Sequence, residues 1–215
     1  TREPIDPVRF LGNKSSGRQG LAIAAAAARA GARVRVIAAN IDDSVMACLP
    51  SSVEVTRVGS AQQMREATLA QVRGADALVM TAAVADFRPE ATHASKMKKD
   101  PSTSDAPTLH LVRNPDILSE VGHSVTRPPL VVGFAAETGT DEEILAYGAD
   151  KAARKGADYI ALNRVGAGVG FGDVPNDIRL LDASGAIVGR YTGSKDEVAA
   201  GLIGQIAAFL DSLER

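Results

Sequence analysis

The chain has 215 residues, of which 45% are apolar and 23% are charged, and its formal net charge at neutral pH is -2. This length and composition suit one globular domain with its own core, and the small net charge gives no basic field that would attract nucleic acid. There is no apolar run long enough to span a bilayer and no signal peptide, and the single cysteine, Cys48, cannot form an internal disulfide, so we expect a cytoplasmic protein without a nucleic-acid or membrane partner.

The first residues, Thr1 to Pro7, include prolines at positions 4 and 7 and predict a loop. A doubly wound domain normally begins with a strand. We therefore expect residues 1–215 to form a single domain that is the C-terminal part of a longer polypeptide.

Beyond this loop, strands and helices alternate, which predicts a parallel sheet covered by helices. Helices are expected after Gly17 to about residue 30, from Ser60 to about 73, from 117, over 141–155, and from Ser194 to 213. Strands are expected at 34–38, 53–58, 76–80, 109–112, 130–134 and 159–162. Residues 166–172 predict a glycine-rich loop, and 178–181 with 186–191 predict a hairpin about Ser184 and Gly185. Residues 87–105 break this rhythm as a long polar segment, and loops of that length are usually functional or disordered.

The segment from Asp76 to Lys99 carries the most information about function. An apolar strand at 77–80 runs into a loop of small residues at 81–85, and the acid Asp86 follows directly. Small residues allow a ligand to approach the backbone, and open α/β sheets bind ligands beyond the carboxyl ends of their strands. Three lysines between residues 96 and 99 can meet phosphate oxygens, although a solvated basic loop is the alternative interpretation. The combination is typical of a nucleotide-binding crevice.

A second candidate site is the run from Gly12 to Gly20, GNKSSGRQG, which precedes the first predicted helix. Such residues expose backbone N–H groups at the positive end of the helix dipole, which favours phosphate. The run is not a P-loop, since Arg18 and Gln19 follow Gly17, and it lacks the G-x-G-x-x-G spacing of dinucleotide sites. A tight turn that caps the helix explains the glycines equally well. Asn13 is more specific, because its amide can both donate and accept a hydrogen bond.

Other candidates carry weaker signals. Lys151 and Lys155 stand four residues apart on one helix face, but they are ordinary surface lysines if taken alone. Phe134 ends a predicted strand and could stack on a base, or it could belong to the core. The three histidines are scattered, no cysteines stand at zinc spacing, and no pattern supports a covalent nucleophile.

Several motifs, taken in order, resemble one known family. They are Thr1–Arg9, Asn13–Gly17, Ala82–Arg88, Lys96–Lys99, Asn114–Ile117 and Val132–Thr138. The chain is similar to the bacterial phosphopantothenate–cysteine ligases, the synthetase half of the bifunctional coenzyme A biosynthesis flavoprotein. The resemblance covers nearly the whole chain in the expected order, which is far more specific than any one motif. We therefore expect an α/β fold with a Rossmann-like, mostly parallel sheet covered by helices, a projecting strand and loop arm, and a C-terminal hairpin.

The resemblance implies a CTP-dependent ligase. The carboxylate of 4′-phosphopantothenate attacks the α-phosphate of CTP, pyrophosphate leaves, and the amine of L-cysteine then displaces CMP from the acyl-cytidylate. Mg²⁺ accompanies the triphosphate, without protein ligands assigned. The resemblance places CTP at Met80, Thr81, Ala82, Asp86, Lys96, Pro115, Asp116, Ile117, Leu118, Phe134, Lys151 and Lys155. It places phosphopantothenate and the acyl intermediate at Asn13, Ser15, Ser16, Gly17, Ala82 and Ala83.

Two of these residues are expected to be catalytic. Lys96 would act on the phosphates during nucleotidyl transfer, and Asn13 would bond to the oxyanion as the amine attacks. The family's upstream strand, glycine loop and flavin decarboxylase domain are not among these residues, so we expect no flavin here. The family is dimeric, and the segment 87–112 suits a two-fold interface, with a higher assembly through the decarboxylase domain.

Two other functions remain as alternatives. One is a nicotinamide-dependent reductase, against which the sequence lacks a strong G-x-G-x-x-G and a Tyr-x-x-x-Lys pair. The other is a nucleotide-sensing domain without catalysis.

Overall fold

The computed structural model describes residues 1–99, 102, 106–137, 139–164 and 176–213. Its helices and strands run in the order β1 (Arg2–Asp6), β2 (Arg9–Gly12), α1 (Arg18–Arg29), β3 (Arg35–Ala39), α2 (Asp43–Met46), β4 (Glu54–Val58), α3 (Ala61–Gln71), β5 (Ala77–Met80), β6 (Phe87–Pro89), β7 (Leu111–Arg113), α4 (Ile117–Gly122), β8 (Leu130–Glu137), α5 (Asp141–Lys155), β9 (Tyr159–Arg164), β10 (Asn176–Asp182), β11 (Ile187–Gly193) and α6 (Lys195–Leu213). The predicted glycine-rich loop at 166–172 lies outside the described residues.

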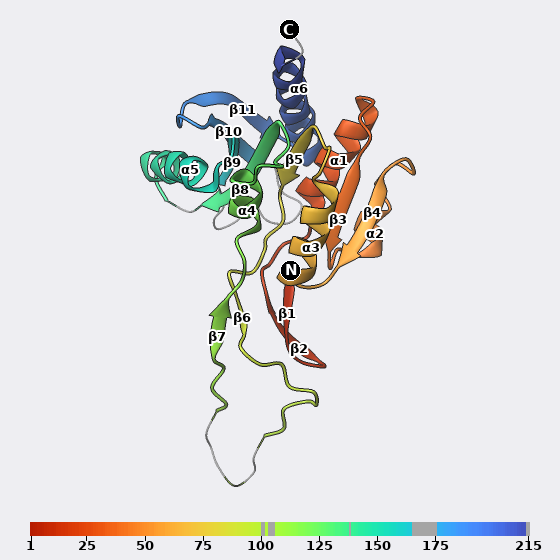
Figure 1. The fold of residues 1–215 in the computed structure, drawn as a ribbon, viewed down its shortest axis with the longest axis vertical. Helices are drawn as coiled ribbons and strands as arrows, with labels where there is room; N and C mark the ends of the chain where they lie inside the picture. The colour runs from red at the N-terminus through yellow and green to blue at the C-terminus, as the bar shows by residue number, and fades with distance from the viewer. Residues whose placement is uncertain (100–101, 103–105, 138, 165–175, 214–215) are drawn as a thin grey trace.

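The centre of the molecule is a five-stranded sheet in the order β11-β10-β9-β8-β5 (Figure 1). Strands β5, β8 and β9 are parallel, whereas β10 and β11 are antiparallel to their neighbours. The α/β class and the C-terminal hairpin are therefore confirmed. The central sheet is mixed, because the hairpin joins its edge, and β3 and β4 form a separate parallel pair on the β5 side.

Helices cover both faces of this sheet. Leu130 and Val132 of β8 pack with α1 and α6, whereas Val131 between them packs with α4 and α5. The same alternation holds in β9, where Tyr159 faces the first layer and Ile160 the second. Because both faces are buried, these strands read in sequence as continuous apolar runs rather than as alternating ones.

Side-chain caps mark where helices α3, α5 and α6 begin, as one also does for α4. Ser60 accepts a hydrogen bond from the Gln63 backbone N–H and Gln63 returns one to the Ser60 backbone, which is a capping box. Thr140 and Glu143 form the same arrangement at α5, and Ser194 caps α6 through the Glu197 N–H at 3.2 Å. The predicted caps at Ser60 and Ser194 are confirmed, and the polar residues before each apolar run explain the element boundaries.

The first residues were predicted as a loop, and this prediction is wrong. They form the antiparallel hairpin β1–β2, which turns at Asp6-Pro7-Val8-Arg9. Asp at the first and Pro at the second position of a four-residue turn is a common turn signature, so the prolines mark a hairpin rather than an irregular segment. The side chain of Glu3 from β1 is buried and accepts a hydrogen bond from the Ala61 N–H at 2.9 Å, which ties the hairpin to the first turn of α3.

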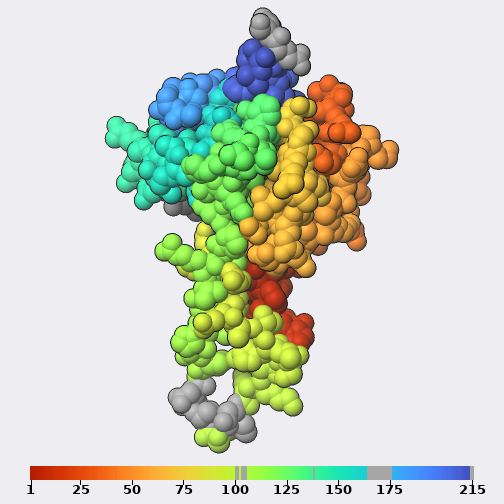
Figure 2. All heavy atoms as spheres, viewed as in Figure 1, coloured from red at the N-terminus to blue at the C-terminus, as the bar shows by residue number. Residues whose placement is uncertain are grey.

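The segment after β5 leaves the body of the molecule as a projecting arm, as predicted, and Figure 2 shows this arm descending beside the hairpin β1–β2. The arm is not all loop, because β6 and β7 form an antiparallel ladder in which Phe87 pairs with Arg113 and Pro89 pairs with Leu111. Thr92 and His93 attach the arm to β1, because Thr92 Oγ1 donates to Pro4 O at 3.2 Å and His93 N–H donates to Ile5 O at 2.9 Å.

None of the helices among the described residues has the length and apolarity needed to cross a membrane.

Candidate functional site

The structure brings the glycine-rich run and the strand-end loop together. The Asn13 amide donates to the carbonyl oxygens of Ala83 and Val84, each at 3.3 Å. Helix α1 also reaches this loop, since a Cβ placed on Gly20 would lie 2.5 Å from Thr81 Oγ1. Two segments about seventy residues apart in sequence therefore form one surface, because β5 ends where α1 begins.

At this surface, no described side chain caps the N-terminus of α1, so its polar groups are available to a ligand. Helix α1 has no side-chain hydrogen bond at its N-cap, Gly17, which has a φ of 74°. The side chains of Ser15 and Ser16 are exposed beside it. Gly17 also has a structural reason to be glycine, because a Cβ there would collide with the Ile41 side chain. The two interpretations of this glycine, a turn that caps the helix and part of an anion-binding site, are thus compatible.

The start of α4 lies next to the same loop. The side-chain amide of Asn114 donates to Ala85 O at 2.8 Å, and its backbone N–H donates to Asp86 O at 2.8 Å. Asp116 then caps α4 by accepting from the Ser119 N–H at 3.0 Å. These bonds fix the predicted nucleotide residues 115–118 relative to Asp86, whose side chain is exposed.

Two lysines of α5 face carboxylates close to this surface. Lys155 forms an ion pair with Asp116, and Lys151 Nζ lies 3.7 Å from Glu137 Oε1. Burial by itself would raise the pKa of Asp116, but the hydrogen bonds from Lys155 and from the Ser119 N–H, with the charges of both lysines, outweigh it and lower that pKa. Without a ligand, each of these lysines is therefore paired with a carboxylate of the protein.

Phe134 does not end its strand, so that prediction is wrong. Strand β8 continues for three further residues to Glu137, and Phe134 is half-buried against the core cluster beneath α1 and α6. Met80 is the last residue of β5 and pairs with Gly133, but its side chain packs with the layer of α4 and α5, on the opposite face of the sheet from Phe134. A Cβ at Gly133 would lie 2.5 Å from Leu118 Cδ2, so a larger residue there would force the Leu118 side chain to move. Thr138, which completes the motif at the end of this strand, lies outside the described residues.

Lys96 is the predicted residue that the structure does not bring to the others. The residue after it, Met97, bonds to Asp6 at the turn of the β1–β2 hairpin, whereas Asn13 follows the opposite end of β2. Four strand residues at about 3.3 Å each separate these ends, a distance of about 13 Å. Figure 1 likewise shows the arm extending away from the five-stranded sheet.

Three polar residues organise this region, and the sequence predicted no role for any of them, although all three lie in the motifs that carry the family resemblance. Asn114 links the strand-end loop to α4, and Asp6 with Arg9 holds the lysine segment of the arm. An Asp-Pro pair signals the turn at Asp6, but no local pattern indicates which distant backbone groups these side chains reach.

The described residues contain no group of three or more His, Cys, Asp or Glu side chains placed to hold a metal ion. A cavity of about 440 Å³ lies elsewhere, between α2 and β4, and contains none of the predicted site residues.

The fold and this surface define a class: a layered α/β domain with a small-residue loop and a helix N-terminus at the end of a parallel strand. The family model for the DNA/pantothenate metabolism flavoprotein C-terminal domain matches residues 1–210. The chain belongs to this family.

Known relatives are similar over almost all of the chain. The coenzyme A biosynthesis bifunctional protein CoaBC of Mycobacterium tuberculosis is 43% identical over 216 residues, which cover 98% of this chain and 50% of the relative. CoaBC of Mycolicibacterium smegmatis is 42% identical, with 99% and 51% covered. A crystal structure of the C-terminal domain of CoaBC matches with a TM-score of 0.77 and 31% identity over 99% of this chain and 92% of that one. The chain thus spans about half the length of these curated relatives and matches their C-terminal domain.

Proposed function

We propose that the chain is a phosphopantothenate–cysteine ligase, a single synthetase domain over residues 1–215 that uses CTP. The observation that carries the proposal is the match to the C-terminal domain of a coenzyme A biosynthesis protein, with Asn13 lying against the strand-end loop. In this proposal the parallel strands β5, β8 and β9 are the core of a Rossmann-like sheet, and CTP binds beyond the carboxyl end of β5.

The proposed reaction has two steps. A carboxylate oxygen of 4′-phosphopantothenate bonds to the α-phosphorus of CTP, and the bond from that phosphorus to the bridging oxygen breaks, so pyrophosphate leaves. The amine nitrogen of L-cysteine then bonds to the acyl carbon, loses a proton, and CMP leaves. Nucleotidyl transfer needs mainly positioning and stabilisation of charge, which lysines and helix N-termini supply.

The described side chains support specific roles in this proposal. Residues 80–82 and 115–118 with Asp86 line the nucleotide, and Lys151 and Lys155 exchange their carboxylate partners for phosphate. Asn13, with the turn at 15–17 and residues 82–83, holds the pantothenate acyl group, and its amide N–H exchanges a backbone carbonyl partner for the oxyanion in the second step. Mg²⁺ enters as part of the nucleotide substrate, since it commonly keeps waters and phosphate oxygens as ligands and the described part of the chain holds no cluster of three or more His, Cys, Asp or Glu side chains for it. The domain uses no flavin in this proposal and works in the cytoplasm.

We further propose that the domain is a homodimer formed through the arm. Large apolar side chains are exposed on the arm and on the adjacent hairpin, among them Phe10, Phe87 and Leu111. Such side chains clustered on a projecting ladder suit a two-fold interface. We expect Phe87→Ser to shift the protein toward monomer in sedimentation velocity, whereas Val125→Ser, which removes a fully exposed apolar side chain in the turn before β8, leaves the distribution unchanged. Equal behaviour of the two variants would contradict the interface.

The experiment that tests the function is pyrophosphate release from CTP with Mg²⁺, with and without 4′-phosphopantothenate. We expect release that depends on phosphopantothenate, followed by CMP release when L-cysteine is added. Hydride transfer to a carbonyl substrate would favour a nicotinamide-dependent reductase instead, and nucleotide binding without turnover would favour a sensing domain. Lys96→Gln should slow pyrophosphate release, whereas Asn13→Ala should slow CMP release more than pyrophosphate release.

A further inference from the structure

The turn of the β1–β2 hairpin is built around one carboxylate. Asp6 Oδ1 accepts hydrogen bonds from the backbone N–H groups of Val8 and Arg9, each at 2.9 Å. An Asp followed by Pro commonly starts such a turn, because the side chain bonds the backbone two residues on and Pro presets its own φ. The Asp6 side chain has no exposed surface, so its second oxygen also needs a partner.

That second oxygen reaches across to the arm. Asp6 Oδ2 accepts a hydrogen bond from the Met97 N–H at 3.1 Å, and Arg9 Nη2 donates to Met97 O at 2.6 Å. Arg9 Nε lies 3.4 Å from Asp6 Oδ2, so the two side chains form an ion pair that holds both polar backbone groups of one residue. Met97 lies between Lys96 and Lys98, whose side chains are exposed.

We propose that Asp6, acting with Arg9, is a positioning residue that latches the lysine segment of the arm and so sets where Lys96 is presented. The role in catalysis rests on the proposed function; the latch itself is a feature of the ligand-free chain. Exposed segments with few buried apolar contacts open locally at small free-energy cost, and the latch is the polar contact that opposes such opening at Met97.

The electrostatics of the turn agree with this assignment. Burial by itself would raise the pKa of Asp6, but the three backbone N–H groups of Val8, Met97 and Arg9 and the charge of Arg9 outweigh it and lower that pKa. The carboxylate is therefore charged at neutral pH, when hydrogen bonds to it are strongest.

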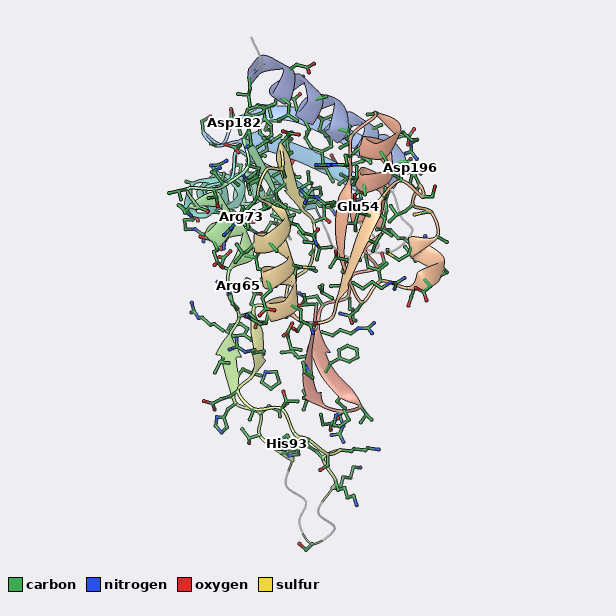
Figure 3. All side chains as sticks on the ribbon, turned by 45° about the vertical axis from the view of Figure 1, so that its right-hand side comes forward. Glu54, Arg65, Arg73, His93, Asp182 and Asp196 are labelled. Carbon is green, nitrogen blue, oxygen red and sulfur yellow. The ribbon has the colours of Figure 1, made fainter. Side chains whose placement is uncertain are left out.

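The variant that isolates the latch is Asp6→Asn. An amide has one acceptor oxygen, and facing it toward Val8 and Arg9 keeps two hydrogen bonds of the turn. The NH₂ group then faces the Met97 N–H and the Arg9 guanidinium, so donor meets donor, and the hydrogen bond from the Met97 N–H and the ion pair with Arg9 are lost. Asp182→Asn is the matched control, because Asp182 likewise holds a hairpin turn by accepting from Ser184 and Ala186 N–H groups. Figure 3 shows Asp182 far from His93 on the arm.

The first readout is trypsin cleavage of the ligand-free protein after the lysines at 96–99, followed by mass spectrometry. Losing a hydrogen bond to a charged group shifts a local equilibrium about tenfold or more, so Asp6→Asn should raise this cleavage rate about tenfold. The kcat/KM for CTP should fall by a smaller factor. It depends on the fraction of molecules in which the latch is closed, and that fraction is already large in the wild type. Asp182→Asn should change neither quantity.

A second variant covers the case in which Asp6→Asn fails to fold. Arg9→Lys keeps the charge beside Asp6 but loses the planar guanidinium that reaches Met97 O. We expect the same two changes, each smaller, because the Met97 N–H keeps its partner. Wild-type cleavage at 96–99 in both variants, or an equal increase in Asp182→Asn, would overturn the latch. Raised cleavage in a protein whose wild type releases no pyrophosphate would support the latch and refute the ligase.

Discussion

The contact between α4 and α5 should not tolerate a single added methyl group. Gly122 ends α4 and Gly156 follows α5, and their backbones touch directly. A Cβ placed on Gly122 would lie 2.8 Å from Gly156 O and nearer still to Lys155 O. Ordinary contacts need about 3.5 Å, so in Gly122→Ala the two helix ends must separate by more than about 0.7 Å. Backbone atoms cannot rotate away as a side chain can.

The expected loss of stability follows from this geometry. Overpacking costs about 1–3 kcal/mol, and a collision with backbone belongs at the upper end of that range. Alanine returns about 0.5–1 kcal/mol relative to glycine in a helix, which leaves a net loss of about 2 kcal/mol. For a domain of this size, the melting temperature should fall by about 4–8 °C.

Gly204→Ala makes the same chemical change where no atom lies within 4 Å of the added Cβ, on the exposed surface of α6. It should raise the stability by about 0.5–1 kcal/mol, so the two variants are expected to differ in sign. Thermal unfolding followed by circular dichroism measures both. A Gly122→Ala variant as stable as the wild type would refute the close backbone contact between α4 and α5. At a temperature at which both variants are folded, the Gly122 variant alone should raise KM for CTP, because residues 116–118 form the N-cap and first turn of α4.

Two further predictions concern the predicted site. Because the arm carries Lys96 away from Asn13, we expect each site to combine residues of two chains, so mixing inactive Asn13→Ala and Lys96→Gln proteins should restore activity. Random exchange makes half of the dimers mixed, each with one intact site of two, which is about a quarter of wild-type activity; no recovery after subunit exchange would refute shared sites. The lowered pKa of Asp116 means that its pair with Lys155 stabilises the fold above the unfolded-state pKa of about 3.9, and that this contribution is lost as pH falls through the lower folded-state value. The difference in urea stability between wild type and Asp116→Asn should therefore be constant above about pH 5 and shrink toward pH 3, and a difference independent of pH would show that the pair contributes nothing.

Much of the secondary structure was predictable because its signals are local. The helix over Asp141–Lys155 begins at a capping box and ends at Gly156, which has a φ of 60°, and the sequence predicted both ends. The hairpin β1–β2 was mistaken for a loop because its prolines obscure the strand pattern, and its partner groups on α3 and the arm are distant in sequence.

By itself, the sequence determined the α/β class, the caps at Ser60 and Ser194 and the C-terminal hairpin, since each depends on the chemistry of a few neighbouring residues. It also predicted which residues could meet a nucleotide. Only the tertiary structure decided which of those residues lie together. Asn13 lies against residues 83–84 because α1 packs beside the end of β5, and Lys155 meets Asp116 because two glycines let α4 and α5 touch. It also separated Lys96 from this surface and attached its neighbour Met97 to Asp6. Such contacts depend on packing between segments that are distant in the sequence, and no local sequence pattern predicts them.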